Sequence, residues 1–221
     1  MIRMLCIADI FSLINAIFGF IAIIMAFSGE IRLSFSFILL AMLADGLDGI
    51  IARKISQSDL GEYLESMADM TSLCIAPAVF IFHIYFEVVS ISIYFYIYLL
   101  IVLFLFLSFG IIRLASFHVM KKKDYFIGLP ASVSTIILII CAVLKVDFFY
   151  LLFIIIVVSF ALVSSVRFPK PDIKINISAV VLVFLTLIMW KTYQNVALII
   201  FLFSVIIYAI CGPIYLFINK Q

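Results

Sequence analysis

Apolar residues run along this chain in long blocks that short polar stretches separate. A helix needs about 20 apolar residues to cross the hydrocarbon layer of a membrane. The blocks predict about eight transmembrane helices, at 5–27, 33–52, 62–85, 89–116, 127–145, 148–166, 175–191 and 195–217. The first block is too long for a signal peptide and lacks a small-residue cleavage site, so we expect it to be retained. The pattern predicts an all-α integral membrane protein.

Composition supports this fold class. The chain is 68% hydrophobic and 12% charged, and its mean hydropathy of +1.41 lies far outside the range of soluble globular proteins. No linker is long enough to separate soluble domains, so we expect one membrane domain over 1–221. A net charge of +2 is too small to indicate a nucleic-acid partner, whereas membrane lipid is an expected one.

The distribution of Lys and Arg predicts the orientation. With the N-terminus in the cytoplasm, eleven of the fourteen basic residues lie on or near the cytoplasmic side. Cytoplasmic loops of membrane proteins carry such an excess of positive charge. We therefore expect a multi-pass protein of the cell membrane with both termini in the cytoplasm.

The polar residues of the second and third predicted helices contain a group of carboxylates. Asp45 and Asp48 lie near the end of one helix, and Glu62, Glu65 and Asp69 follow near the start of the next. Spacings of three and four place side chains on one face of a helix. A short link joins the two helices, so we expect their acidic faces to meet just inside the cytoplasmic boundary.

Carboxylates that converge in a partly dry site repel one another unless cations neutralise them. Hard divalent cations such as Mg²⁺, Mn²⁺ and Ca²⁺ prefer oxygen ligands, and carboxylates could bridge two such ions about 4 Å apart. The cluster therefore favours a metal site. Glu62 lies near the water boundary, where a solvated or capping role is the stronger interpretation.

Small residues share the second helix with the aspartates. Gly46, Gly49 and Ala52 lie beside them, and Gly costs about 1 kcal/mol in a helix interior. One interpretation is that a ligand approaches the backbone closely here. The other is tight packing between helices, which is common in membranes. The neighbouring carboxylates and Arg53 favour the first.

Together these residues resemble the signature of the CDP-alcohol phosphotransferase family, D-x-x-D-G-x-x-A-R-x8-G-x-x-x-D-x-x-x-D. The matching positions, within residues 45–69, are Asp45, Asp48, Gly49, Ala52, Arg53, Gly61, Glu65 and Asp69. The chain departs from the pattern twice. Seven residues separate Arg53 from Gly61, and Glu65 stands where the family has Asp.

The resemblance implies a fold and a chemistry. The fold would be a six-helix catalytic core, here followed by two C-terminal helices. Two divalent cations, Mg²⁺ or Mn²⁺, would bind the diphosphate of a CDP-linked substrate, and an acceptor hydroxyl would displace CMP. By position, the metal ligands would be Asp45, Asp48, Glu65 and Asp69. Asp69 would also be the general base that takes the hydroxyl proton.

The resemblance also implies a nucleotide site facing the cytoplasm. Gly49 and Ala52 would make room for the nucleotide, Arg53 would meet phosphate, and Ser58 matches a family position near the nucleotide. In the first helix, "ADIFSLINAIFGFIAI" resembles the family's P-N-x-x-T-L-x-N opening. That match implicates Asp9 and Ser12 in binding the CDP-lipid.

Three further stretches are similar to segments of the phosphatidylserine synthase branch. They are "IIRLASFHV", "YFIGLPASVS" and "SSVRFPKP". The first contains Arg113, whose guanidinium could bind the carboxylate of serine in a bidentate fork. The alternative is that Arg113 extends to the membrane surface, and the sequence does not separate the two.

The resemblance therefore implies transfer of a phosphatidyl or archaetidyl group from CDP-diacylglycerol or CDP-archaeol to L-serine, with release of CMP. It also implies a homodimer. One alternative is a sister enzyme that uses inositol phosphate or glycerol phosphate. Another is a cation-coupled transporter, because intramembrane carboxylates also mark ion paths. A transporter would carry acidic residues in paired repeats, and no such repeat is seen in the sequence.

Overall fold

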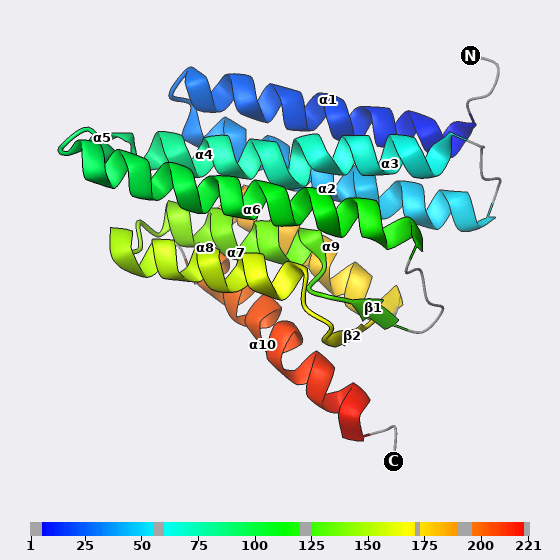
Figure 1. The fold of residues 1–221 in the computed structure, drawn as a ribbon. Coiled ribbons are helices and arrows are strands. Elements are labelled where there is room, and N and C mark those ends of the chain that lie inside the picture. Colours follow the sequence, from blue (N-terminus) through cyan, green and yellow to red (C-terminus); the bar gives the residue numbers. More distant parts are fainter. Residues whose placement is uncertain (1–5, 55–59, 120–124, 171–172, 190–195, 219–221) are drawn as a thin grey trace. The chain divides into compact units, whose positions relative to one another are not determined.

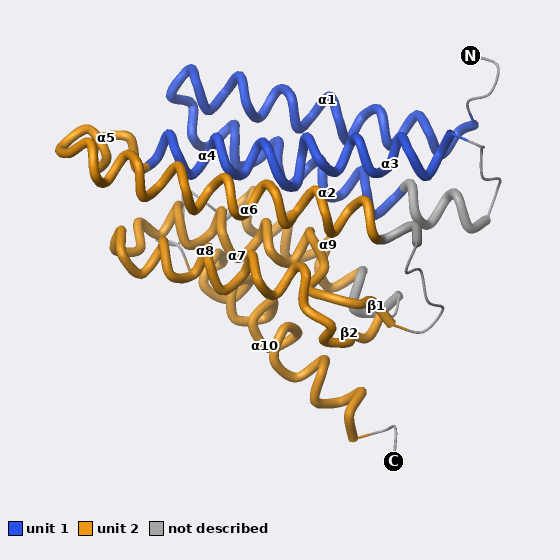
Figure 2. Tube along the Cα trace, in the orientation of Figure 1, with its two compact units in different colours: residues 1–84 blue, residues 85–221 orange. Residues whose placement is uncertain are grey.

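The structure is a computed structural model of the chain. It describes residues 6–54, 60–119, 125–170, 173–189 and 196–218, without the side chains of 48–54, 117–119, 173–176 and 189. The chain divides into two compact units, residues 1–84 and 85–221 (Figure 2). The prediction of one membrane domain over the whole chain remains a prediction.

The first unit is built from two long helices and a third, interrupted one (Figure 1). Helix α1 spans Ile7–Phe27 and α2 spans Ile31–Lys54. The third consists of α3 (Gly61–Asp69), the π-helix η2 (Met70–Ile75) and α4 (Ala76–Ile84). All three of these segments pack against α1.

A tight turn at Gly29 joins α1 to α2. Gly29 has a φ of +79°, and the Glu30 and Gly29 amides donate to the carbonyls of Met25 and Ala26 at 2.9 and 3.1 Å. This pair of hydrogen bonds is the Schellman motif, which ends a helix with a left-handed residue. The Ser34 hydroxyl of α2 then donates to the Ala22 carbonyl of α1 at 2.8 Å, so the two helices lie close together.

The second unit holds the remaining helices and a small sheet (Figure 1). The short helix α5 (Phe86–Val89) precedes the long helix α6 (Ile93–Val119). The other helices are α7 (Ala131–Val143), α8 (Phe148–Leu162), α9 (Ile173–Met189) and α10 (Val196–Ile218). Helix α6 packs on α8, and α10 packs on α7 and α9.

Two short strands, which the sequence pattern did not predict, join distant parts of this unit. Strand β1 (Tyr125–Ile127) pairs antiparallel with β2 (Arg167–Pro169). Gly128 follows β1 with a φ of +77°, and its amide donates to the Val166 carbonyl at 2.8 Å. The Tyr208 hydroxyl of α10 donates to the Pro169 carbonyl at 2.8 Å, so α10 holds the end of the ladder.

The membrane prediction is confirmed in its coarse form. Among the described residues, four helices are long and apolar enough to span a membrane: 7–27, 61–84, 93–116 and 196–218. Three shorter apolar helices lie at 131–143, 148–162 and 177–188. Each of the eight predicted segments contains a helix, although the three shorter ones fall below the length of a straight span. The number of spans therefore remains a prediction.

Candidate active site

Three polar side chains lie buried on one face of α1. They are Asp9, Ser12 and Asn15, spaced three apart near the start of the helix, and each is at most 4% exposed. The Asp9 carboxylate accepts the backbone N–H of Cys6 at 2.7 Å. This contact caps the helix in the manner of a capping box. The structure gives Asp9 a local capping role, and its predicted part in nucleotide binding remains a prediction, as does that of Ser12.

Asn15 connects α1 to the last acidic position of the signature. Its amide nitrogen Nδ2 donates to Oδ1 of Asp69 at 2.9 Å, across 54 positions of sequence. Asn15 is 0% exposed and Asp69 is 8% exposed. A hydrogen bond between an amide and a carboxylate is strong when both groups are buried. The first-helix motif and the acidic signature therefore meet at this contact.

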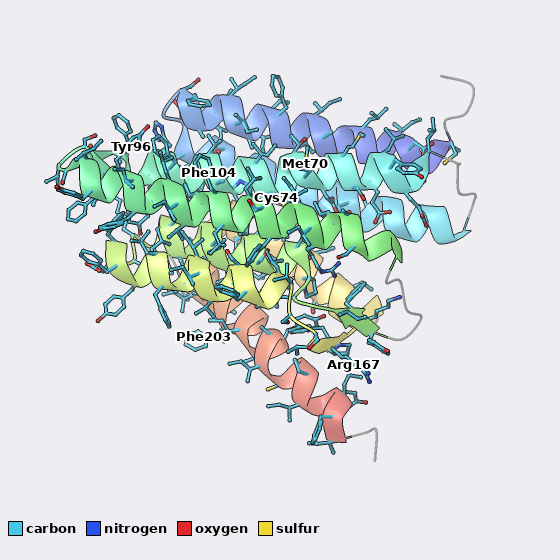
Figure 3. The ribbon with its side chains drawn as sticks, viewed as in Figure 1. Met70, Cys74, Tyr96, Phe104, Arg167 and Phe203 are labelled. Atoms are coloured by element: carbon cyan, nitrogen blue, oxygen red, sulfur yellow. The ribbon has the colours of Figure 1, made fainter. Side chains whose placement is uncertain are left out.

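The helix changes from α-helical to π-helical geometry directly after Asp69. The π-helix η2 begins at Met70, and Met70 and Cys74 are labelled on it in Figure 3. π-helical turns are rare and occur often at functional sites. The backbone of η2 lies so close to α1 that a Cβ on Gly19 would be 2.8 Å from the Ser72 Cα. Gly19 lies one turn after Asn15, so the close approach and the hydrogen bond belong to one face of α1.

The remaining predicted metal ligands are described only in part. Asp45 and Glu65 are partly buried on α2 and α3. Within the part of the chain that the structure describes, no group of three or more His, Cys, Asp or Glu could hold a metal ion. The predicted ligand set also requires Asp48, whose side chain lies outside the described residues. The metal site remains a prediction.

The signature's other predicted nucleotide positions also lie outside the described side chains. They are Gly49, Ala52, Arg53 and Ser58. Arg113 belongs to the second unit, on α6, and is 7% exposed. Its burial argues against a side chain that extends to the membrane surface, and its contact with serine remains a prediction.

Cationic and aromatic side chains lie together at the β ladder. The Arg167 guanidinium lies 5.0 Å from the centre of the Tyr125 ring, and Arg167 is labelled in Figure 3. The Lys170 ammonium lies 5.4 Å from the centre of the Phe126 ring. These are cation–π distances, and they reinforce the pairing of the two strands.

Two features, one in each unit, were not predicted. Asn15 occupies the last position of the P-N-x-x-T-L-x-N opening, so the motif contained a signal for it. The pairing of "YFIGLP" with "SSVRFP" through β1 and β2 had no local signal, because it joins segments about 40 positions apart in sequence.

The chain matches proteins of one family along most of its length. The family model described as CDP-alcohol phosphatidyltransferase matches residues 5–210. A Methanothermobacter thermautotrophicus protein named archaetidylserine synthase is 30% identical over 177 residues, which cover 74% of this chain and 70% of that protein. A Methanocaldococcus jannaschii protein is 29% identical over 176 residues, or 79% of each chain. A Helicobacter pylori protein is 26% identical over 226 residues, covering 96% of this chain and 92% of that one. The last two are both named CDP-diacylglycerol–serine O-phosphatidyltransferase.

Proposed function

We propose that this chain, which belongs to the CDP-alcohol phosphatidyltransferase family, transfers a phosphatidyl or archaetidyl group from a CDP-activated lipid to the hydroxyl of L-serine. The observation that carries the choice of serine is the set of relatives described above. All three have names that specify a serine product or a serine acceptor. The three stretches that resemble the phosphatidylserine synthase branch support the same choice.

The reaction is a substitution at phosphorus. The serine hydroxyl oxygen forms a bond to the lipid-bearing phosphorus, and the bond from that phosphorus to the oxygen of CMP breaks. CMP leaves with the electron pair, and Asp69 accepts the hydroxyl proton. A general base must reach the proton that it removes. The hydrogen bond from Asn15 holds one carboxylate oxygen of Asp69, which restricts the directions in which the base can point.

Divalent cations are part of the proposal. The donor set of Asp45, Asp48, Glu65 and Asp69 consists of carboxylate oxygens, the ligand type that Mg²⁺ and Mn²⁺ prefer, so the residues fit these ions by chemistry. When bound, the ions would neutralise the diphosphate and stabilise the departing CMP. Arg53 would meet phosphate, and Gly49, Ala52, Ser58, Asp9 and Ser12 would form the rest of the nucleotide site.

The remaining parts of the proposal rest on the sequence and on the family resemblance. Arg113 is our candidate for the serine carboxylate, because a guanidinium binds a carboxylate through two parallel hydrogen bonds. The protein would lie in the cell membrane as a homodimer, with the site facing the cytoplasm. Exposed apolar side chains on the long helices support membrane residence, among them Phe104 on α6 and Phe203 on α10 (Figure 3).

CMP release tests the proposal directly. Purified protein in detergent is incubated with CDP-diacylglycerol or its ether-linked counterpart and Mn²⁺ or Mg²⁺. L-serine, glycerol 3-phosphate and inositol phosphate are offered separately. We expect metal-dependent release of CMP with serine alone. Release with only another alcohol would overturn the choice of serine and retain the family.

Glu65 requires a second protein in the same assay. Glu65→Asp restores the family's aspartate at that position, and we expect it to release CMP at least as fast as the wild type. If both proteins are silent with every alcohol and both lipids, the proposed function is wrong.

A further inference from the structure

The amide of Asn15 offers two different groups in the interior of the first unit. Its nitrogen Nδ2 donates to Oδ1 of Asp69 at 2.9 Å. Its oxygen Oδ1 is fully buried and has no hydrogen-bond partner among the described residues. Since Asn15 is 0% exposed, a ligand reaches this oxygen only when neighbouring side chains move aside. The amide nitrogen therefore takes part in a hydrogen bond within the fold, and the amide oxygen does not.

A purely structural role does not explain this arrangement. An interhelical hydrogen bond in a membrane protein contributes modestly, whereas a buried oxygen without a hydrogen-bond donor carries a desolvation penalty of at least similar size. Such oxygens in native proteins are rare and call for a specific explanation. The explanation that fits an oxygen beside a proposed general base is a ligand that arrives with a hydrogen-bond donor.

The surroundings of the oxygen restrict the class of ligand. Asp69 and the Asn15 oxygen are both hydrogen-bond acceptors, so together they repel the oxygens of a phosphate and attract a hydroxyl or an ammonium group. The close approach of Gly19 to Ser72 fixes α1 against η2 one turn away, so the pair cannot easily separate. The cytosine amino group and the ribose hydroxyls of the nucleotide carry such donors as well. The acceptor alcohol fits better, because its hydroxyl is the group that must lie beside the proposed base Asp69.

We propose that Asn15 serves the acceptor side of the active site in two ways. Its amide nitrogen positions the Asp69 carboxylate, and its amide oxygen accepts a hydrogen bond from the hydroxyl or ammonium group of the incoming alcohol. This inference rests on the proposed function, because it takes Asp69 as the group that receives the alcohol proton. It adds a residue that contacts the acceptor.

Two substitutions separate the two roles. Asn15→Leu removes both polar groups and preserves the approximate volume. Asn15→Asp keeps an oxygen at the place of Oδ1 and removes the N–H that holds Asp69. With Asn15→Leu we expect the KM for serine to rise at least about tenfold and kcat to fall at least about tenfold, while the KM for the CDP-lipid stays within about twofold. With Asn15→Asp we expect a similar fall in kcat. The KM for serine should stay within about threefold of the wild-type value.

Ser34→Ala is the matched control. It removes another buried interhelical hydrogen bond of the same unit, from the Ser34 hydroxyl to the Ala22 carbonyl at 2.8 Å. Loss of an interhelical contact alone would lower stability and leave both KM values and kcat within about twofold. If the Asn15 variants behave as this control does, the inference is wrong.

The remaining outcomes are equally specific. An unchanged serine KM in Asn15→Leu, with a lowered kcat, would overturn the contact with the alcohol. A Mn²⁺-induced rise in the unfolding temperature gives a readout that needs no turnover, and Asn15→Leu should reduce that rise by more than half. An equal rise in both proteins would overturn the positioning of Asp69. A wild type that releases no CMP with any alcohol would instead overturn the proposed function, so the two failures are distinguishable.

Discussion

A Cβ atom added to Gly19 would lie 2.8 Å from the Cα of Ser72, so the backbones of α1 and η2 meet where only glycine leaves room. The contact atoms belong to the backbone and to the first side-chain atom of Ser72, which cannot rotate away. Asn15 lies one turn before Gly19 and holds Asp69, so the spacing of these helices also sets the geometry of the candidate base.

Substitution of Gly19 tests this spacing. We expect Gly19→Ala to destabilise the protein by about 1–3 kcal/mol, because overpacking forces backbone shifts that outweigh the better helix propensity of alanine. CMP release should fall as well, since the shift moves Asn15 relative to Asp69. Thermal unfolding in detergent and the CMP assay measure the two effects.

Gly46→Ala is the control for stability. Gly46 also lies in a helix, but nothing comes within 4 Å of a Cβ built on it. Alanine should therefore be neutral there or stabilise by about 0.5–1 kcal/mol. Equal behaviour of the two variants would show that the approach of Ser72 is not tight.

Gly128 combines two demands that exclude a side chain. Its φ is +77°, and a Cβ would lie 2.2 Å from the carbonyl oxygen of Leu162. We expect Gly128→Ala to destabilise the protein by more than about 2 kcal/mol, because the left-handed backbone costs about 1–2 kcal/mol and the clash with a backbone oxygen adds to it. The unfolding temperature measures the loss.

Gly29→Ala isolates the backbone contribution. Gly29 has a similar φ of +79°, yet nothing lies within 4 Å of its added Cβ. Its substitution should cost only about 1–2 kcal/mol. A cost at Gly29 equal to that at Gly128 would mean that the Leu162 carbonyl moves aside.

Tyr85 follows the apolar helix at 61–84. We expect this residue to make the stability of the protein fall with rising pH in the alkaline range. Burial raises the pKa of Tyr85 from 10.0 to about 12, and the nearby Cys141 and Asp147 act in the same direction. Between these values the unfolded chain loses the phenol proton while the folded chain keeps it, so stability falls as pH rises above 10. The Tyr85 hydroxyl also donates to the Val146 carbonyl, and Tyr85→Phe should cost about 1 kcal/mol at pH 8.

The measurement is the unfolding temperature at pH 8 and at pH 10 to 11. Tyr85→Phe should lose less stability over this interval than the wild type does. Tyr94→Phe is the matched control, because Tyr94 is largely exposed on α6, and it should follow the wild type. A wild type and a Tyr85→Phe variant with the same alkaline loss would contradict the prediction.

Substitution of Asp69 by asparagine should lower activity without unfolding the protein. The side-chain amide that Asp69→Asn introduces can still accept the hydrogen bond from Asn15, but it is a poor base, so CMP release should fall at least about 100-fold. EDTA should abolish release by the wild type, and added Mn²⁺ or Mg²⁺ should restore it. Asp147→Asn serves as the control, since Asp147 caps α8 by accepting the Phe149 amide at 3.0 Å and asparagine caps equally well. If Asp69→Asn retains wild-type turnover, the assignment of the base is wrong.

The sequence by itself determined the fold class and the family. Each predicted span contains a helix because runs of apolar residues encode membrane helices locally. The acidic positions from Asp45 to Asp69 and the opening of the first helix identified the family because their spacings are local as well.

Only the tertiary structure decided which distant groups meet. The hydrogen bond between Asn15 and Asp69, the contact of Gly19 with Ser72, and the pairing of Phe126 with Phe168 join residues from separate segments. No local periodicity specifies such contacts. They depend on how closely helices pack, on a π-helical turn that changes the direction of successive side chains, and on which backbone groups remain to be hydrogen-bonded at the ends of helices. The sequence thus named the acidic residues of the predicted site, and packing decided how Asp69 is held.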